Sequence, residues 1–237
     1  MILLVAVRSA LFAFVQIVTT PVFAIVGLLT FPLPLAVRYR VISTWSRLMV
    51  IAVRMICGIR YVVRGRENIP DAPCIVLSKH QSAWETLVFQ VIFPPQVWVL
   101  KRELLWVPFF GWGLAMLAPI AIDRKAGRKA LKQMLEQGVD RLTRGFWIVM
   151  FPEGTRVAPG QRGTYHIGGA WLANRTGTPV LPIAHNAGHF WRRQAFLKYP
   201  GTVTVSIGPL MQPDGTPDEL NTRVSTWIED EVARMNP

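Results

Sequence analysis

The sequence predicts an α/β fold in which helices flank a mostly parallel sheet, preceded by a membrane-associated helical segment. Three observations lead to this prediction. From about residue 60 onward, short β-branched runs alternate with helical stretches, a pattern typical of parallel sheets covered on both faces. Residues 9–37 carry no charged side chain. The length of 237 residues suits one α/β domain and is too short for two with linkers.

The uncharged run at 9–37 is long enough to cross a bilayer, since about 20 helical residues span a hydrocarbon core of roughly 30 Å. Pro21, Pro32 and Pro34 interrupt it. Pro21 either kinks one helix or divides it into two short pieces within one leaflet. A full span and an interfacial or re-entrant insertion both remain open. A cleaved signal peptide is disfavoured because the apolar stretch continues past the candidate cleavage site at 22–24.

The next segment is expected to be a basic, apolar helix over residues 41–59. Arg40, Arg47 and Arg54 recur every seven residues, so a helix places them on one face, with apolar side chains around the rest. Such a helix can dock on anionic headgroups. The alternative is an ordinary core helix whose arginine face is solvated.

The charge distribution indicates the kind of partner. A net charge of +12 with 51% hydrophobic residues excludes a disordered chain and favours a partner rich in phosphates or carboxylates. Residues 1–66 hold eight arginines and no acid, and a segment both basic and apolar favours a membrane surface over nucleic acid.

We therefore expect residues 1–58 to be the membrane anchor and residues 59–237 to be the α/β domain. If the apolar run spans the membrane once, the arginines after it place that domain on the cytoplasmic side of the inner membrane.

Runs rich in Val and Ile predict seven strands, and helical patterns between them predict five helices. The expected strands cover residues 59–63, 74–78, 96–100, 119–122, 147–151, 180–184 and 202–207. The expected helices cover residues 82–92, 107–118, 127–143, 168–175 and 218–235. Ligands of parallel sheets bind at the carboxyl ends of the strands. Side chains that carry chemistry should therefore directly follow strands.

The first candidate site follows the strand at 74–78. His80 stands at the end of this strand, and Glu85 comes five residues later, inside the next helix. A carboxylate that holds an imidazole fixes its tautomer, so the other ring nitrogen can take a proton from a hydroxyl. A lone histidine near a strand end is more often structural. The glutamate and the basic neighbour Lys79 keep a catalytic role open beside the structural one.

The second candidate site is the turn Phe-Pro-Glu-Gly-Thr-Arg at residues 151–156, which again follows an apolar strand. Glu153 supplies a hydrogen-bond acceptor, and Gly154 permits a tight turn. Thr155 supplies a hydroxyl, and Arg156 supplies a guanidinium. A guanidinium is suited to bidentate recognition of phosphate. Such a turn is often only structural, but its position before a glycine-rich loop favours a substrate clamp.

Three further candidates lie at or after other strands. Arg124 follows the strand that ends at residue 122 and offers a second phosphate contact. Lys101 follows the strand at 96–100 and is a further candidate for substrate binding. Pro182 interrupts an apolar strand that could wall an acyl pocket.

The pattern does not support a metal centre. Cys57 and Cys74 lie in apolar runs and form neither a disulfide framework nor a zinc site, so we expect buried thiols in a reduced compartment. His166, His185 and His189 have no carboxylate at a matching spacing, and the sequence contains neither H-E-x-x-H nor D-x-D.

Taken in order, these blocks resemble the glycerolipid acyltransferase family, and within it the 1-acyl-sn-glycerol-3-phosphate acyltransferases. The resemblance rests on His-x4-acid at 80–85, Ile-Asp-Arg at 122–124, the turn at 151–156 and the block around Pro182. It covers roughly residues 60–208 in addition to the N-terminal membrane segment. A Phe-Pro-Glu-Gly-Thr-Arg turn downstream of His-x4-acid is a highly specific combination.

Two positions depart from the family pattern. Glu85 stands where the family usually has aspartate, one methylene shorter, so the hydrogen bond to His80 must adjust. The family commonly has a lysine soon after the turn, whereas residues 163–168 offer Tyr165 and His166. The missing lysine favours an alternative acceptor, another lyso-lipid such as a lyso-amino-acid lipid.

The resemblance implies transfer of a fatty acyl group from a thioester, acyl-CoA or acyl carrier protein, to the sn-2 hydroxyl of 1-acyl-glycerol-3-phosphate. His80 would take the hydroxyl proton and Glu85 would steady the imidazolium, while backbone N–H groups near the start of the following helix stabilise the oxyanion. Substrate contacts are expected from Lys101, Arg124, Glu153, Gly154, Thr155, Arg156 and Pro182. No metal, bound cofactor or acyl-enzyme is implied. The alternative from another class is a non-catalytic membrane lipid-binding protein, which would not need the histidine–carboxylate pair.

Overall fold

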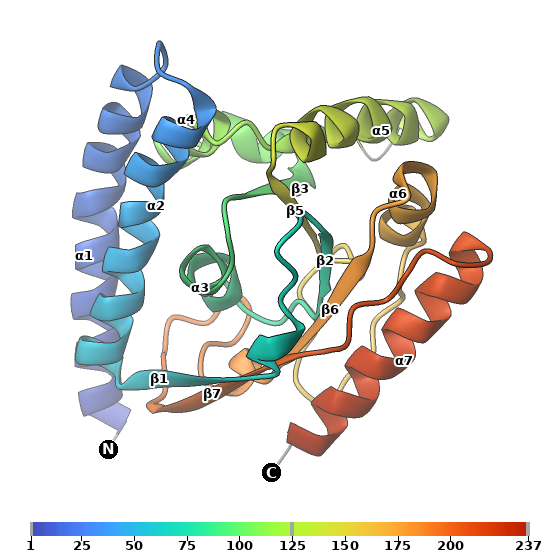
Figure 1. Ribbon diagram of the computed structural model, residues 1–237. Coiled ribbons are helices and arrows are strands. Elements are labelled where there is room, and N and C mark those ends of the chain that lie inside the picture. The colour runs from blue at the N-terminus through green and yellow to red at the C-terminus, as the bar shows by residue number, and fades with distance from the viewer. Residues whose placement is uncertain (1, 124–125, 236–237) are drawn as a thin grey trace.

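A helical hairpin precedes the sheet in the computed structural model, which describes residues 2–123 and 126–235 (Figure 1). Helix α1 (Ile2–Leu29) and helix α2 (Leu35–Ala52) run side by side in opposite directions. A π-helical turn, η1 (Val53–Cys57), continues α2. It stops at Gly58, whose φ of +73° is the left-handed conformation that ends many helices.

Helix α1 is one helix and not two. Pro21 lies inside it, so the division into two short pieces does not occur. The helix ends before Pro32 and Pro34, which cannot continue it. Among the described residues, α1 alone is long and apolar enough to cross a membrane, with a mean hydropathy of 2.2. Only 17% of its most apolar stretch is buried, whereas a core helix of a soluble protein would be mostly buried.

The arginine face expected on the second helix is present. Arg40, Arg47 and Arg54 are all exposed on α2 and η1. Met49 and Val53, on the opposite side, are fully buried. The helical segment therefore packs on the domain with its apolar face and turns its cations outward.

Seven strands form one sheet in the order β1-β7-β6-β2-β5-β3-β4. The strands are β1 (Ile59–Arg64), β2 (Ile75–Ser78), β3 (Gln96–Lys101), β4 (Ile120–Ile122), β5 (Trp147–Met150), β6 (Val180–His185) and β7 (Gly201–Ile207). All neighbouring strands are parallel except β6 and β7. The predicted α/β class is thereby confirmed, and each predicted strand is found with its bounds shifted by a residue or less.

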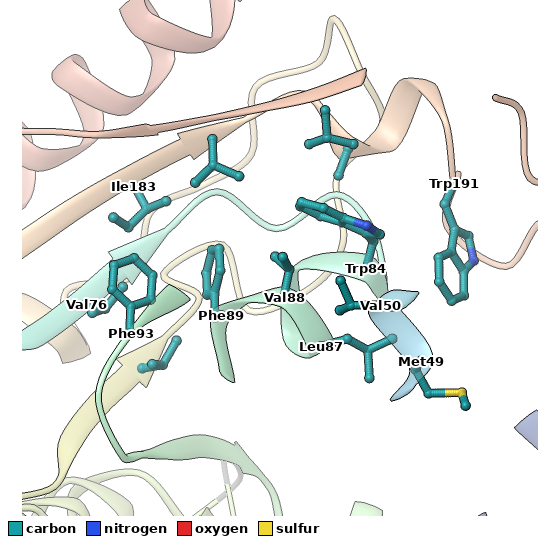
Figure 2. Packing of buried hydrophobic residues seen from close by; sticks show 14 of the residues in the cluster. Met49, Val50, Val76, Trp84, Leu87, Val88, Phe89, Phe93, Ile183 and Trp191 are labelled. Atoms are coloured by element: carbon teal, nitrogen blue, oxygen red, sulfur yellow. The ribbon is translucent and has the colours of Figure 1, made fainter. Parts of the chain in front are cut away.

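Helices cover both faces of the sheet (Figure 1). They are α3 (Trp84–Ile92), α4 (Phe110–Met116), α5 (Arg128–Thr143), α6 (Gly168–Thr176) and α7 (Pro217–Met235), with short helical turns at η2 (Arg66–Asn68), η3 (Arg102–Trp106) and η5 (Ala187–His189). The hairpin and α3 lie on one face, and α5, α6 and α7 on the other. Figure 2 shows Trp84, Val88 and Phe89 of α3 in one cluster of buried side chains with Ile183 of β6.

The helix predicted over residues 107–118 is present but shorter than expected, since α4 covers only Phe110–Met116. The chain forms η3 and then α4, which begins only at Phe110. Pro108 disfavours a helical conformation at the preceding residue, and Val107 is extended, with φ −67° and ψ 119°. Phe109 has a positive φ of 60° and turns the chain into α4.

Helix α1 is docked to the domain through one buried aromatic side chain. Phe12 is fully buried and meets the Trp191 ring edge-on, with centroids 5.5 Å apart. The ammonium of Lys198 lies 5.4 Å from the Phe12 ring centroid, and the Lys198 backbone N–H donates to Ser9 Oγ at 2.9 Å. The hairpin is thus packed against the loop between β6 and β7.

We expect Phe12→Ala to lower the free energy of unfolding by about 3–5 kcal/mol, because it leaves a cavity beside Trp191. Phe14→Ala is the matched control, because Phe14 lies two residues further along the same helix and is 63% exposed. Chemical denaturation in detergent, followed by circular dichroism, measures both. Equal stability of the two variants would contradict this description of the docking.

Candidate active site

His80 follows the central strand β2 and is held by Glu85. The imidazole Nδ1 lies 2.8 Å from Glu85 Oε1, and the ring stacks on Phe151 with centroids 3.8 Å apart. An ionised carboxylate only accepts, so Nδ1 carries the proton. Nε2 is then the ring nitrogen left to exchange a proton with a substrate.

The carboxylate of Glu85 also organises the start of α3. Its Oε1 accepts hydrogen bonds from the backbone N–H groups of Gln81 and Ser82, at 3.0 and 2.8 Å. Ser82 Oγ in turn accepts from the N–H of Trp84 at 3.1 Å. One half of the capping box expected of Ser-x-x-Glu is thus formed, from the Ser82 N–H to Glu85, whereas the Ser82 hydroxyl accepts from Trp84 and not from Glu85. The longer glutamate thus reaches His80 while it also binds the backbone of the turn before α3.

Two backbone N–H groups between His80 and α3 are already used within the fold. Those of Gln81 and Ser82 bind Glu85. An oxyanion stabilised near the start of this helix would have to use other N–H groups. The bonds from Gln81 and Ser82 hold the carboxylate that binds His80.

The pKa of Glu85 lies below its usual range although the side chain is fully buried. Burial by itself raises this pKa. The adjacent His185 and the hydrogen bonds from His80 and Ser82 lower it, and together they prevail. Glu85 is therefore ionised at neutral pH.

His185 is a neighbour that spacing along the chain did not reveal. Its Nε2 donates to the carbonyl of Lys79 at 2.9 Å and lies 3.9 Å from Glu85 Oε1. Its Nδ1 accepts from the N–H of Ala187 at 3.3 Å. Burial lowers its pKa, which fits the neutral ring that these two bonds require. Strand β6 brings it there because Ile183 pairs in register with Ser78 of β2.

Lys79 lies on the other side of the chain from the imidazole. Its ammonium is fully buried and forms ion pairs with Glu153 Oε1 and Glu229 Oε1, each at 2.7 Å. Glu153 Oε2 accepts from the backbone N–H of His80 at 2.8 Å, and Tyr165 donates its hydroxyl to Glu229 at 2.7 Å. Burial raises the pKa of Glu153. Lys79 therefore fixes the two site segments to each other and to α7.

A cavity of about 450 Å³ borders the His80 ring and runs between the sheet edge and the hairpin. Arg156, Lys101 and Thr155 contribute polar side chains to its wall, and Gly154 lines it as well. Most of the remaining wall is apolar and comes from α1, α2, α3 and α4: Phe23, Ile42, Leu87, Phe110 and Leu114. The size and mixed lining are those of a site for a ligand with one polar and one apolar end.

The expected substrate residues divide into three groups. Lys101, Gly154, Thr155 and Arg156 line the cavity with His80. Glu153 and Pro182 are buried and do not line it. Arg124 lies outside the described residues.

One wall residue, Arg193, was not anticipated. It follows η5, and its guanidinium donates to the carbonyl of Arg156 at 3.0 Å. No motif in the sequence marks it, because the contact joins two loops far apart in the chain.

The two cysteines, Cys57 and Cys74, are free and buried as expected, and burial raises the pKa of both thiols. Over residues 2–123 and 126–235, no three His, Cys, Asp or Glu side chains are grouped so that they could hold a metal ion.

Comparison with known proteins identifies the family. The family model described as Acyltransferase matches residues 60–186. The chain belongs to this acyltransferase family. It is 48% identical to 1-acyl-sn-glycerol-3-phosphate acyltransferase of Pseudomonas aeruginosa, over 98% of this chain and 93% of that protein. It is 32% identical to the human 1-acyl-sn-glycerol-3-phosphate acyltransferase alpha, over 78% of this chain and 68% of that protein.

The fold of this acyltransferase also has a solved counterpart. The crystal structure of the 1-acyl-sn-glycerophosphate (LPA) acyltransferase PlsC from Thermotoga maritima matches with a TM-score of 0.80. The match covers 97% of this chain and 95% of that one, at 24% identity. The helical hairpin is therefore part of the shared fold.

The pKa of Glu85 predicts a pH-dependent contribution to stability. Because its folded pKa is lowered, the carboxylate stabilises the fold above the unfolded pKa of about 4.3 and loses this effect as the pH falls through the folded value. Glu85→Gln should cost about 1.5–3 kcal/mol at neutral pH, with the difference from wild type shrinking below about pH 4. Urea unfolding across a pH series measures it.

Glu136→Gln is the control for this experiment, because Glu136 is 65% exposed in a surface pair with Lys132. It should change stability little at any pH. A cost of Glu85→Gln that is independent of pH would show that ionisation of this carboxyl does not stabilise the fold.

Proposed function

We propose that this enzyme moves a fatty acyl group from a thioester to the sn-2 hydroxyl of 1-acyl-glycerol-3-phosphate, forming phosphatidic acid. The observation that supports it most is the His80–Glu85 pair at a cavity with one cationic region and long apolar walls. The named activity of the 48% identical relative supports the same reaction.

The reaction uses His80 as general base and then as general acid. Its Nε2 takes the proton of the sn-2 hydroxyl while the oxygen attacks the thioester carbonyl. Ionised Glu85 stabilises the imidazolium that forms. The tetrahedral intermediate collapses, the C–S bond breaks, and the thiolate takes the proton back from His80. The carrier thiol leaves and the new ester remains.

The acceptor phosphate is assigned to the cationic region of the cavity. Arg156 and Lys101 supply positive charge there, and Thr155 supplies a hydroxyl. Arg193 holds the backbone of Arg156 and adds a second guanidinium at the wall. Glu153 is assigned to positioning, since its two oxygens bind Lys79 and the His80 backbone.

Residues 1–58 are proposed to lie in one leaflet and not to cross the bilayer. The α/β domain packs along α1, at Phe12 in the amino-terminal half and beside Ala24 in the carboxyl-terminal half. Helix α2 runs back along α1 with Arg47 exposed midway, and a charge at the bilayer centre costs about 2.5–3.5 kcal/mol or more. Interfacial insertion keeps these arginines at the headgroups of the cytoplasmic leaflet of the inner membrane.

A panel of donors and acceptors tests the reaction. Purified enzyme is incubated with labelled acyl-CoA or acyl carrier protein and with lysophosphatidic acid, other lysophospholipids or a lyso-amino-acid lipid. Lysophosphatidic acid should be acylated with the highest kcat/KM. A preference for an acceptor without a phosphomonoester would overturn the proposed substrate.

Arg156→Lys tests the phosphate contact, because lysine keeps the charge and loses the planar fork. The kcat/KM for lysophosphatidic acid should fall about ten- to a hundredfold, mainly through the acceptor's KM. The matched control is Arg175→Lys, since Arg175 lies on α6 and is not in the wall of the cavity. A rise only in the KM of the acyl donor would place the donor's phosphates at Arg156.

A further inference from the structure

An exposed apolar patch lies outside the N-terminal hairpin, on η3 and α4. Six large apolar side chains within nine residues are between 38% and 67% exposed: Leu104, Trp106, Val107, Phe109, Phe110 and Trp112. We refer to these six residues as the aromatic patch. Such a concentration of exposed apolar side chains on a folded domain marks an interaction site.

The aromatic patch is continuous with the outer face of α1. Helix α4 approaches the carboxyl-terminal half of α1 closely, since a Cβ built on Gly113 would lie 3.7 Å from Cα of Ala24. Ile25, Leu28 and Leu29 of α1 expose their side chains at the same end. Figure 1 shows α4 beside the ends of α1 and α2 that the interhelical turn connects. One apolar surface therefore extends from the hairpin onto the α/β domain.

The composition of the aromatic patch suits the boundary between headgroups and acyl chains. Trp106 and Trp112 have the amphipathic rings that are enriched at membrane interfaces. The guanidinium of Arg102 lies 5.9 Å from the Trp106 ring centroid. This cation can reach lipid phosphates while the rings are immersed.

The cavity lies between the two parts of this surface. Leu104 and Phe110 of the aromatic patch form one part of its wall, and Phe23 and Ala24 of α1 form another. A substrate with a long acyl chain would therefore enter the cavity from the bilayer between the aromatic patch and α1. This arrangement favours a lipid leaflet over a protein as the occupant of the aromatic patch.

We propose that η3 and α4 are a second membrane-inserting element, which immerses the aromatic patch in the same leaflet as α1. This inference rests on the proposed insertion of the hairpin in one leaflet. It adds that the membrane contact includes the α/β domain, so that the domain is held against the bilayer at two places.

Site-specific fluorescence tests the insertion directly. Trp106→Cys, Phe14→Cys and Val139→Cys are each labelled with an environment-sensitive fluorophore in the full-length chain, since the native Cys57 and Cys74 are buried. Phe14 is the reference on α1, and Val139, 46% exposed on α5, is the control on the far face. The protein is bound to vesicles of phosphatidylethanolamine and phosphatidylglycerol containing brominated lipid.

We expect a blue shift and bromine quenching at positions 14 and 106 and neither at position 139. A membrane signal at position 14 with an aqueous signal at position 106 would overturn the proposal that η3 and α4 insert. It would leave the proposed membrane contact of the hairpin intact. An aqueous signal at both positions would overturn both proposals.

A binding measurement provides an independent test. Trp106→Glu combined with Trp112→Glu should weaken binding to these vesicles by about tenfold or more, whereas Val139→Glu should not. Neither tryptophan lines the cavity, so turnover of a short-chain, water-soluble lysophosphatidic acid should be unchanged and shows that the variant is folded. Unchanged vesicle affinity with normal turnover would contradict the proposal.

Discussion

The active site depends on a single buried carboxylate oxygen, Oε1 of Glu85. It receives His80 Nδ1 and the backbone N–H groups of Gln81 and Ser82, each within 3.0 Å. The same atom therefore fixes the tautomer of the imidazole, the turn after β2 and the start of α3. Burial alone would raise the pKa of this carboxyl, but the adjacent His185 and the hydrogen bonds from His80 and Ser82 lower it, so that the carboxylate stays ionised. An ionised carboxylate is what an imidazolium requires as a partner.

A second buried group of charges, formed by Lys79, Glu153 and Glu229, stabilises this arrangement. Lys79 and His80 are adjacent in the chain, yet the ammonium lies buried between Glu153 and Glu229 whereas the imidazole borders the cavity. Glu153 also binds the His80 backbone, so the turn at 151–156 and the histidine segment share one carboxylate. The carboxyl-terminal helix α7 contributes through Glu229. The cation paired with Glu153 thus comes from Lys79, in a chain that lacks the family's usual lysine after the turn.

Most of the fold could be predicted from the sequence, because apolar β-branched runs mark buried strands and caps mark helix starts. Helix α4 begins later than predicted because Pro108 disfavours a helical conformation at Val107. The histidine–glutamate pair is local and was predictable from its spacing. His185 was not, because its proximity to Glu85 depends on β6 lying beside β2, and strand order is not encoded in any short motif. Glu153 was expected to contact the substrate. The structure shows it buried against Lys79, and this contact could not be predicted because the two residues lie far apart in the chain.

The central claim is that His80, held by Glu85, is the base that activates the acceptor hydroxyl. The most direct measurement is the single-turnover rate of acyl transfer to lysophosphatidic acid by His80→Ala, with folding confirmed by its unfolding curve. The rate at saturating acceptor should fall about 10²–10⁴-fold. The acceptor concentration needed for saturation should change little, because the apolar walls and Arg156 remain. A rate close to that of the wild type would contradict the mechanism.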